Sequence, residues 1–245
     1  MRIDSHHSFS ERHTLDFLGT ILKRNRFEGS IVVTGHIAHF PDFVQGIVIE
    51  ADLRDPHLPH LLDRCQLDPR FKGVCYRFTD EFPDGLAELQ RRGITLDANG
   101  GAGIQPAAGS LNACPPVIAS IVERFPAMRI VIDHLGVGDL DGDEWARQIE
   151  RIAQSPQVYC KLSGVAHLRP SPRPYVQHAL AVFGPRRLMF GSDWPSGLPD
   201  ITWKASLAAF TQAIGAQSME VREELLGGTA ERFYGLHRGS FAASV

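Results

Sequence analysis

Short apolar, β-branched runs alternate with longer amphipathic segments along the whole chain. The runs with the length and composition of strands lie at 3–8, 30–35, 46–51, 73–78, 94–99, 129–134, 158–163 and 187–192. Helical patterns occupy about 14–27, 57–67, 83–92, 115–125, 143–154, 174–183 and 202–215, and a last one covers 219–234. This alternation predicts a parallel sheet covered by helices.

Several predicted strands are apolar on both faces. Ile31-Val32-Val33 and Ile130-Val131-Ile132 have no polar alternation, as expected for strands buried between a barrel interior and a ring of helices. An open doubly wound sheet has the same local pattern, but eight strands within 245 residues favour closure. The sequence therefore predicts an α/β fold, a single (β/α)8 TIM barrel, with residues 1–245 as one domain.

The second crossover is too short for a complete helix. Only residues 36–45, which include Pro41, separate the second and third predicted strands, whereas a crossover normally needs about a dozen residues. We therefore expect the second helix to be shortened or missing. Such a gap would expose an apolar flank, so a partner subunit in a homo-oligomer or the C-terminal segment is expected to cover it.

Charge and composition point to a small molecule as the partner. The formal net charge is −3 and the chain is 43% hydrophobic, so no basic face predicts nucleic-acid binding. No apolar run approaches the roughly 20 residues that span a membrane, and Met1 leads directly into a strand pattern, which predicts a cytoplasmic protein. The four cysteines form no CxxC pair, so we expect them to be reduced and mostly buried.

Polar side chains follow most of the apolar strands where those strands end. They are His6, His36, Arg77, Asp97, His134, Lys161 and Asp193. Because the carboxyl ends of barrel strands form the catalytic face, these residues are the candidate site. Strand alternation places Asp4, His6 and Ser8 on one face of the first strand and His7 on the other.

Asp193 is the candidate general base, because it ends the last predicted strand beside Trp194 and Pro195. His134 ends another strand just before Gly136, where the chain leaves the barrel. Each has a structural alternative, because Asp193 can cap the following loop and His134 can bond to nearby backbone. Two further loop histidines, His39 and His167, are expected to be solvated.

The glycine-rich segment 99–103 follows the fifth predicted strand. It lacks the Lys-Ser/Thr of a P-loop and the spacing of a dinucleotide-binding loop, so it is interpreted as a mobile lid.

Four ordered motifs resemble the amidohydrolase-2 family of the amidohydrolase superfamily, above all its sugar-lactone and 2-pyrone-4,6-dicarboxylate lactonases. They are Ile3-Asp4-Ser5-His6, Ile132-Asp133-His134-Leu135-Gly136, Lys161-Leu162-Ser163-Gly164 and Gly191-Ser192-Asp193-Trp194-Pro195. Phe183-Gly184-Pro185 and the segment 230–236 extend the resemblance over nearly all of the chain from about residue 46 onward. The ordered set carries the resemblance, since no single motif is specific.

The resemblance implies a hydrolase that opens a small-molecule lactone. Asp193 would deprotonate the attacking water, while His6, His134 and Lys161 would polarise the carbonyl. His6, His134 and Asp193 are also the expected ligands of one divalent cation, with zinc the best match. The family carries His-x-His in the first strand, where this chain has His6-His7-Ser8. Because one ligand is missing, the sequence favours a mechanism in which the histidines act as hydrogen-bond donors and no cofactor is required.

A second departure concerns substrate binding. Relatives have an arginine directly after the Gly-Val pair, whereas this chain has Gly73-Val74-Cys75-Tyr76-Arg77. Arg77 is expected to bind a substrate carboxylate or hydroxyl groups, with a salt bridge on the barrel rim as its structural alternative. The other expected substrate-binding residues are Lys161, Asp97, His36 and Trp194.

Two other functions remain open from the sequence. One is a metal-dependent decarboxylase of the same superfamily, which the missing histidine disfavours. The other is a catalytically decayed protein that binds a metabolite, which Ser8 and the short second crossover favour.

Overall fold

The computed structural model describes residues 1–36, 38–78, 82–99, 114–137 and 142–236. Its strands are β1 (Ile3–His7), β2 (Gly29–Thr34), β3 (Val44–Glu50), β4 (Phe71–Arg77), β5 (Thr95–Asn99), β6 (Ile130–Ile132), β7 (Val158–Leu162) and β8 (Leu188–Phe190). Its α-helices are α1 (Leu15–Arg24), α2 (Leu58–Cys65), α3 (Gly85–Arg92), α4 (Cys114–Arg124), α5 (Gly142–Ala153), α6 (Arg173–Phe183), α7 (Trp203–Ile214), α8 (Met219–Glu223) and α9 (Thr229–Tyr234). Among these described helices, none combines the length and the apolar character that crossing a membrane would require.

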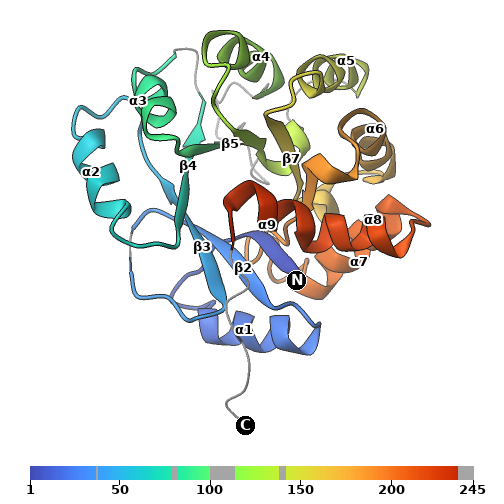
Figure 1. Ribbon diagram of the computed structural model, residues 1–245. Coiled ribbons are helices and arrows are strands. Elements are labelled where there is room, and N and C mark those ends of the chain that lie inside the picture. The colour runs from blue at the N-terminus through green and yellow to red at the C-terminus, as the bar shows by residue number, and fades with distance from the viewer. Residues whose placement is uncertain (37, 79–81, 100–113, 138–141, 237–245) are drawn as a thin grey trace.

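The strands form one parallel eight-stranded sheet in chain order, from β1 to β8. β1 and the end of β8 meet along a seam, where Asp193 N donates to His6 O at 2.9 Å and Ser8 N donates to Trp194 O at 2.8 Å. Helices surround the strands on the outside (Figure 1). The predicted (β/α)8 barrel is therefore confirmed.

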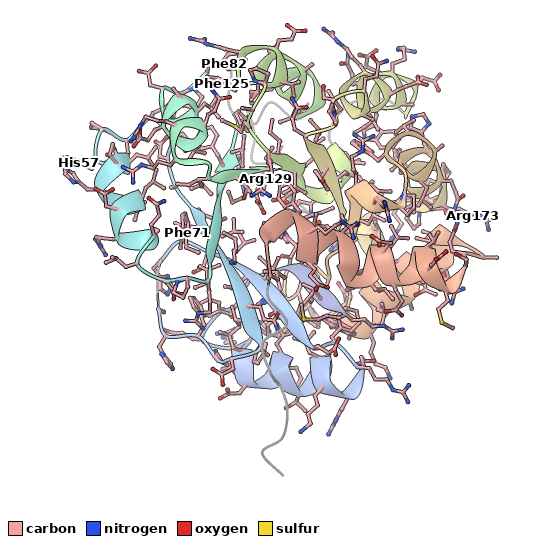
Figure 2. The ribbon with its side chains drawn as sticks, in the orientation of Figure 1. His57, Phe71, Phe82, Phe125, Arg129 and Arg173 are labelled. Carbon is pink, nitrogen blue, oxygen red and sulfur yellow. The ribbon has the colours of Figure 1, made fainter. Side chains whose placement is uncertain are left out.

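Apolar side chains fill the barrel, and the last helix covers one of its ends. One buried cluster comprises Ile3, Ile31, Val33, Val48, Cys75, Val131 and Met189 from the strands, together with Ala230, Phe233, Tyr234 and Leu236. In Figure 1, α9 lies across the near end of the barrel. Arg129, labelled near the middle of Figure 2, donates to Phe233 O at 2.9 Å. The interior is a packed core, so a ligand can enter only from the opposite end.

The connection between β2 and β3 confirms the expected loss of a helix but contradicts the expected exposed flank. Its described residues, 35–36 and 38–43, contain no helix. Phe40 is only 1% exposed, because its ring packs over Val32, Ile47 and Ile49 on the outer face of the sheet. The loop itself thus covers this flank, which removes the reason for expecting a partner subunit there. Residues 237–245, the other expected cover, lie outside the described residues.

The segment predicted as one helix over 219–234 is divided. A π-helical turn at Glu224–Gly228 separates α8 from α9. At Gly227 a Cβ atom would lie 2.0 Å from Met1 O, so the chain passes too close to its own amino-terminal residues for any side chain. This long-range contact, which local periodicity does not encode, interrupts the helix.

β1 departs from the strict alternation that the sequence suggested. Its pairing with β2 is irregular between Asp4 and His7. As a result Asp4 contacts Trp203 of α7 outside the barrel, whereas His6 lines the pocket described below. The expectation that both residues share one face was therefore wrong, because a local irregularity shifts the register.

Asp4 holds the barrel seam together through both of its carboxylate oxygens. Oδ1 accepts from Ser192 N at 2.8 Å and Oδ2 accepts from Trp203 Nε1 at 2.7 Å, and both hydrogen bonds are buried. In Asp4→Asn the amide NH2 must face one of these N–H donors. We expect the free energy of unfolding to fall by about 1–3 kcal/mol, measured by urea denaturation. Asp42→Asn at an exposed position should change it by less than about 0.5 kcal/mol, and equal effects would contradict this role.

Candidate active site

A pocket of about 420 Å³ opens at the carboxyl ends of the barrel strands. His6, His134 and Asp193 line one side of it, and they follow or end β1, β6 and β8. The other side is lined by Thr34, His36, Glu50, Arg77 and Asn99, which come from the ends of β2 to β5. The pocket is large enough for a single small ring and lies where barrel enzymes place their reacting groups.

The structure brings the three residues predicted to react together. One ligand atom from each of His6, His134 and Asp193 lies within 4.8 Å of the others. The rings of His6 and His134 meet edge to face with centroids 4.7 Å apart, and His6 Nε2 is 3.9 Å from Asp193 Oδ1. A carboxylate therefore stands beside two imidazoles in a site that water can reach.

His6 is held from below by two buried charged groups. Its Nδ1 lies 3.2 Å from Lys161 Nζ and 3.4 Å from Asp133 Oδ1. Burial lowers the pKa of His6, but Asp133 and Asp193 together outweigh it and leave this pKa above its ordinary value. Gly191 makes room for the ring, because a Cβ atom there would lie 2.7 Å from His6 Cβ.

His134 occupies a backbone conformation that non-glycine residues rarely adopt. Its φ is 54°, and the next residue, Leu135, has a φ of 59°. The His134 backbone N–H donates to Ser163 Oγ at 3.2 Å, and the same hydroxyl lies 3.0 Å from Nδ1 of the ring. Burial lowers the pKa of His134, so its ring is predominantly neutral at neutral pH, with Nε2 directed away from Ser163.

Asp193 shares this unusual backbone, with a φ of 58°. Its Oδ1 accepts from Ser196 Oγ at 3.2 Å. Its Oδ2 lies 3.7 Å from His167 Nε2, so His167 is not the solvated loop histidine that the sequence suggested. Strained backbone at two of the three reacting residues is typical of functional positions, where the surrounding fold imposes the conformation.

A buried ionic network lies under the pocket floor. Lys161 Nζ is 2.5 Å from Asp97 Oδ2 and 3.0 Å from Asp133 Oδ1, and all three side chains are fully buried. Tyr234 of α9 donates to Asp97 Oδ2 at 2.7 Å. Burial lowers the pKa of Lys161, but Asp133 and Asp97 outweigh it and hold this pKa well above its ordinary value. The pKa of Asp133, which burial alone would raise, is lowered mainly by Lys161.

The structure divides the expected substrate-binding residues into two groups. Arg77 and His36 line the pocket. Lys161 and Asp97 have no exposed surface and lie beneath it, so we now expect them to position His6 rather than contact substrate. Trp194 is 3% exposed, and its ring faces His13 and Phe17 of the α1 region instead of the pocket. Residues 100–103 of the expected lid lie outside the described residues.

Three residues that sequence reasoning did not single out, and one that it expected to be solvated, belong to the candidate site. Asp133 precedes His134 inside a quoted motif, and its position next to a candidate histidine was the available signal. Glu50 ends an apolar strand, just as the predicted residues do. His167 and Tyr234 gave no local signal, because only the tertiary fold brings them to Asp193 and Asp97.

The donor set fits one divalent cation. Two imidazole nitrogens and one carboxylate oxygen converge, which matches the three protein ligands of a catalytic zinc site. Asp133 and Ser163 contact Nδ1 of the two histidines, as outer partners of metal-ligating histidines commonly do. Ser8 also lines the pocket, but a hydroxyl is a weak ligand for zinc.

Comparison with known proteins agrees with this geometry. Residues 34–236 match the model of a protein family described as amidohydrolase. The protein y4mH of Sinorhizobium fredii, whose function is uncharacterised, is 28% identical over 219 residues, which are 78% of this chain and 70% of that protein. An L-fucono-1,5-lactonase of Burkholderia ambifaria is 29% identical over 168 residues, which are 65% of this chain and 58% of that protein.

A solved structure has the same fold. An amidohydrolase from Burkholderia multivorans, crystallised with bound zinc, superposes with a TM-score of 0.78 at 24% identity. The match covers 97% of this chain and 100% of that one. By sequence, in contrast, the chain spans 70% of y4mH and 58% of the lactonase.

Proposed function

The chain belongs to the amidohydrolase family, and on that basis we propose that it is a hydrolase that opens a small-molecule lactone with water activated by Asp193. One observation carries the proposal: a carboxylate stands beside two imidazoles, with His6 Nε2 3.9 Å from Asp193 Oδ1, at the edge of a ring-sized pocket. The similarity to an L-fucono-1,5-lactonase supports the choice of a cyclic ester as substrate.

The three residues can supply the proton transfers that ester opening needs. Asp193 removes a proton from water as the water oxygen attacks the lactone carbonyl, a contribution of about 10² to 10⁴ in rate. The ring C–O bond then breaks, and the proton held by Asp193 passes to the leaving alkoxide. The product is an open-chain hydroxy acid. Ser196 Oγ, which donates to Asp193 Oδ1, keeps the carboxylate oriented for both transfers.

The developing oxyanion needs hydrogen-bond donors, and the histidines can provide them. Lys161 stays charged and donates to His6 Nδ1 at 3.2 Å. His6 Nδ1 then has no proton of its own, so Nε2 carries one and points into the pocket. The same reasoning applies to His134 when Ser163 Oγ donates to its Nδ1. Two N–H groups are thus available where the negative charge develops.

A bound cation would be held by His6, His134 and Asp193. Such an ion polarises a carbonyl and lowers the pKa of bound water. For this role the His6 proton must lie on Nδ1, where Asp133 Oδ1 at 3.4 Å would accept it. A hydrogen bond from Lys161 Nζ, 3.2 Å from the same nitrogen, requires the other tautomer, which serves catalysis by hydrogen bonds without a required metal.

Lactone hydrolysis with and without chelation tests the proposal. We expect the purified protein to acidify weakly buffered medium when given an aldonolactone, because ring opening releases a proton. We also expect kcat/KM to change by less than about twofold after exhaustive chelation, a difference below 0.5 kcal/mol in the barrier. Elemental analysis of the same sample measures bound metal.

Other results would assign other functions. Loss of activity on chelation with recovery on adding zinc would establish the cation mode. Metal-dependent release of carbon dioxide from an aromatic acid would replace the lactonase by a decarboxylase. Ligand-induced thermal stabilisation without turnover of any lactone would indicate a binding protein.

A further inference from the structure

The pocket has a recognition wall opposite its reacting groups. Four strands in a row each contribute their last residue to it: Thr34 from β2, Glu50 from β3, Arg77 from β4 and Asn99 from β5. Because these four strands are neighbours in the sheet, their last residues lie side by side at the mouth of the same pocket. A ring whose carbonyl lies at Asp193 therefore presents its far substituents to this wall.

The recognition wall carries two opposite charges, Glu50 and Arg77, that form no ion pair with each other. Glu50 of β3 pairs in register with Cys75 of the adjacent strand β4, and Arg77 follows Cys75 by two residues. Even so, among the described residues no ion pair within 4.0 Å involves Glu50 or Arg77. Both side chains are exposed in the open pocket, so both are available to a ligand.

A carboxylate and a guanidinium select for different substituents. Two oxygens of a carboxylate can accept hydrogen bonds from neighbouring hydroxyl groups, and such charge-assisted bonds are stronger than neutral ones. The same carboxylate repels an anionic substituent, and this repulsion is larger inside a protein pocket than in water. Arg77 favours an anionic substituent, and the negative charge of Glu50 opposes that preference.

We propose that Glu50 is a specificity-determining residue, which accepts hydrogen bonds from hydroxyl groups of an uncharged, polyhydroxylated lactone and rejects rings that carry a carboxylate. This inference rests on the proposed lactonase activity. It assigns recognition to Glu50 and leaves the chemistry to Asp193, since Glu50 is on the opposite wall.

Two lactones that differ in one substituent test the proposal. D-galactono-1,4-lactone carries a terminal hydroxymethyl group where D-galactaro-1,4-lactone carries a carboxylate. We expect the wild-type protein to prefer the neutral lactone by about tenfold or more in kcat/KM, the low end of what charge-assisted hydrogen bonds contribute. In Glu50→Gln this ratio should fall at least tenfold, through weaker use of the neutral lactone and stronger use of the anionic one.

Two controls separate charge from shape. Glu50→Asp retains the negative charge and should retain the preference for the neutral lactone. For the wild type, raising the salt concentration should improve use of the anionic lactone, because screening weakens repulsion between exposed charges. This second measurement requires no folded variant.

Several outcomes would overturn the inference. A wild-type preference for the anionic lactone, or a ratio that Glu50→Gln leaves within twofold, would contradict a selective role for Glu50 while leaving the lactonase intact. Wild-type protein that opens neither these nor any other lactone would overturn the proposed function and this inference with it.

Discussion

Asp193→Asn is expected to lower kcat/KM for lactone opening by about 10² to 10⁴-fold, because an amide cannot take a proton from water. The fold should survive the change. Asparagine adopts the left-handed conformation found at this position, with a φ of 58°, about as readily as aspartate. It also keeps a carbonyl oxygen that can accept from Ser196 Oγ. The measurement is a pH-stat assay together with the melting temperature of the variant.

A second carboxylate on the same face provides the matched control. Asp200 lies in the loop that follows β8 and is exposed. Asp200→Asn should leave the rate within about twofold of wild type, since it removes an equal charge without touching the reacting groups. An Asp193→Asn protein that folds and hydrolyses lactones at a near wild-type rate would exclude Asp193 as the general base.

Lys161→Met is expected to reduce the free energy of unfolding by about 3–5 kcal/mol, because it leaves two buried carboxylates without their cation. Lys161 Nζ is 2.5 Å from Asp97 Oδ2 and 3.0 Å from Asp133 Oδ1, and none of the three side chains is exposed. Methionine has a similar shape, so loss of packing contributes little. Chemical denaturation followed by circular dichroism measures the loss.

The pH dependence of this loss distinguishes charge from packing. Burial already raises the pKa of Asp97, against the influence of Lys161, and removing the cation raises this pKa further. A carboxyl group whose pKa is higher in the folded state stabilises the fold at low pH and loses that stabilisation as pH rises. The deficit of Lys161→Met should therefore be smaller at about pH 5 than at about pH 8.

The exposed Lys204 of α7 supplies the control substitution. Lys204→Met should change stability by less than about 0.5 kcal/mol at either pH. A deficit in Lys161→Met that does not vary with pH would indicate lost packing instead of unpaired carboxylates.

The predictable part of this protein is the part that local patterns encode. Apolar runs located the strands to within a few residues, and the ten residues after β2 were too few for a helix. The ends of the apolar strands gave seven candidate residues, since parallel strands in a barrel end at one face. The resemblance to a known family then singled out His6, His134 and Asp193, which the structure brings together.

The remaining part depends on contacts between distant segments. Lys161 and Asp97 lie close to the ends of their strands, as Arg77 does, but they are buried and neutralise each other below the pocket. The sequence pattern does not distinguish a charged side chain that finds a buried partner from one that faces solvent in the pocket. Trp194 follows Asp193 yet packs against Phe17, since the chain turns sharply at a residue with positive φ. Pairing and register, which decide these cases, are properties of the completed fold.

The bond between Tyr234 and Asp97 also bears on the order of events during translation. Tyr234 follows His6 by 228 positions along the chain. At about 5–20 residues per second, roughly 10–50 s separate their synthesis. For most of that interval β1 has no β8 to pair with, and throughout it the ionic network below His6 lacks the hydroxyl of Tyr234. We therefore expect a ribosome-bound chain arrested before β8 to be an open sheet with an unpaired strand edge, which is prone to aggregation.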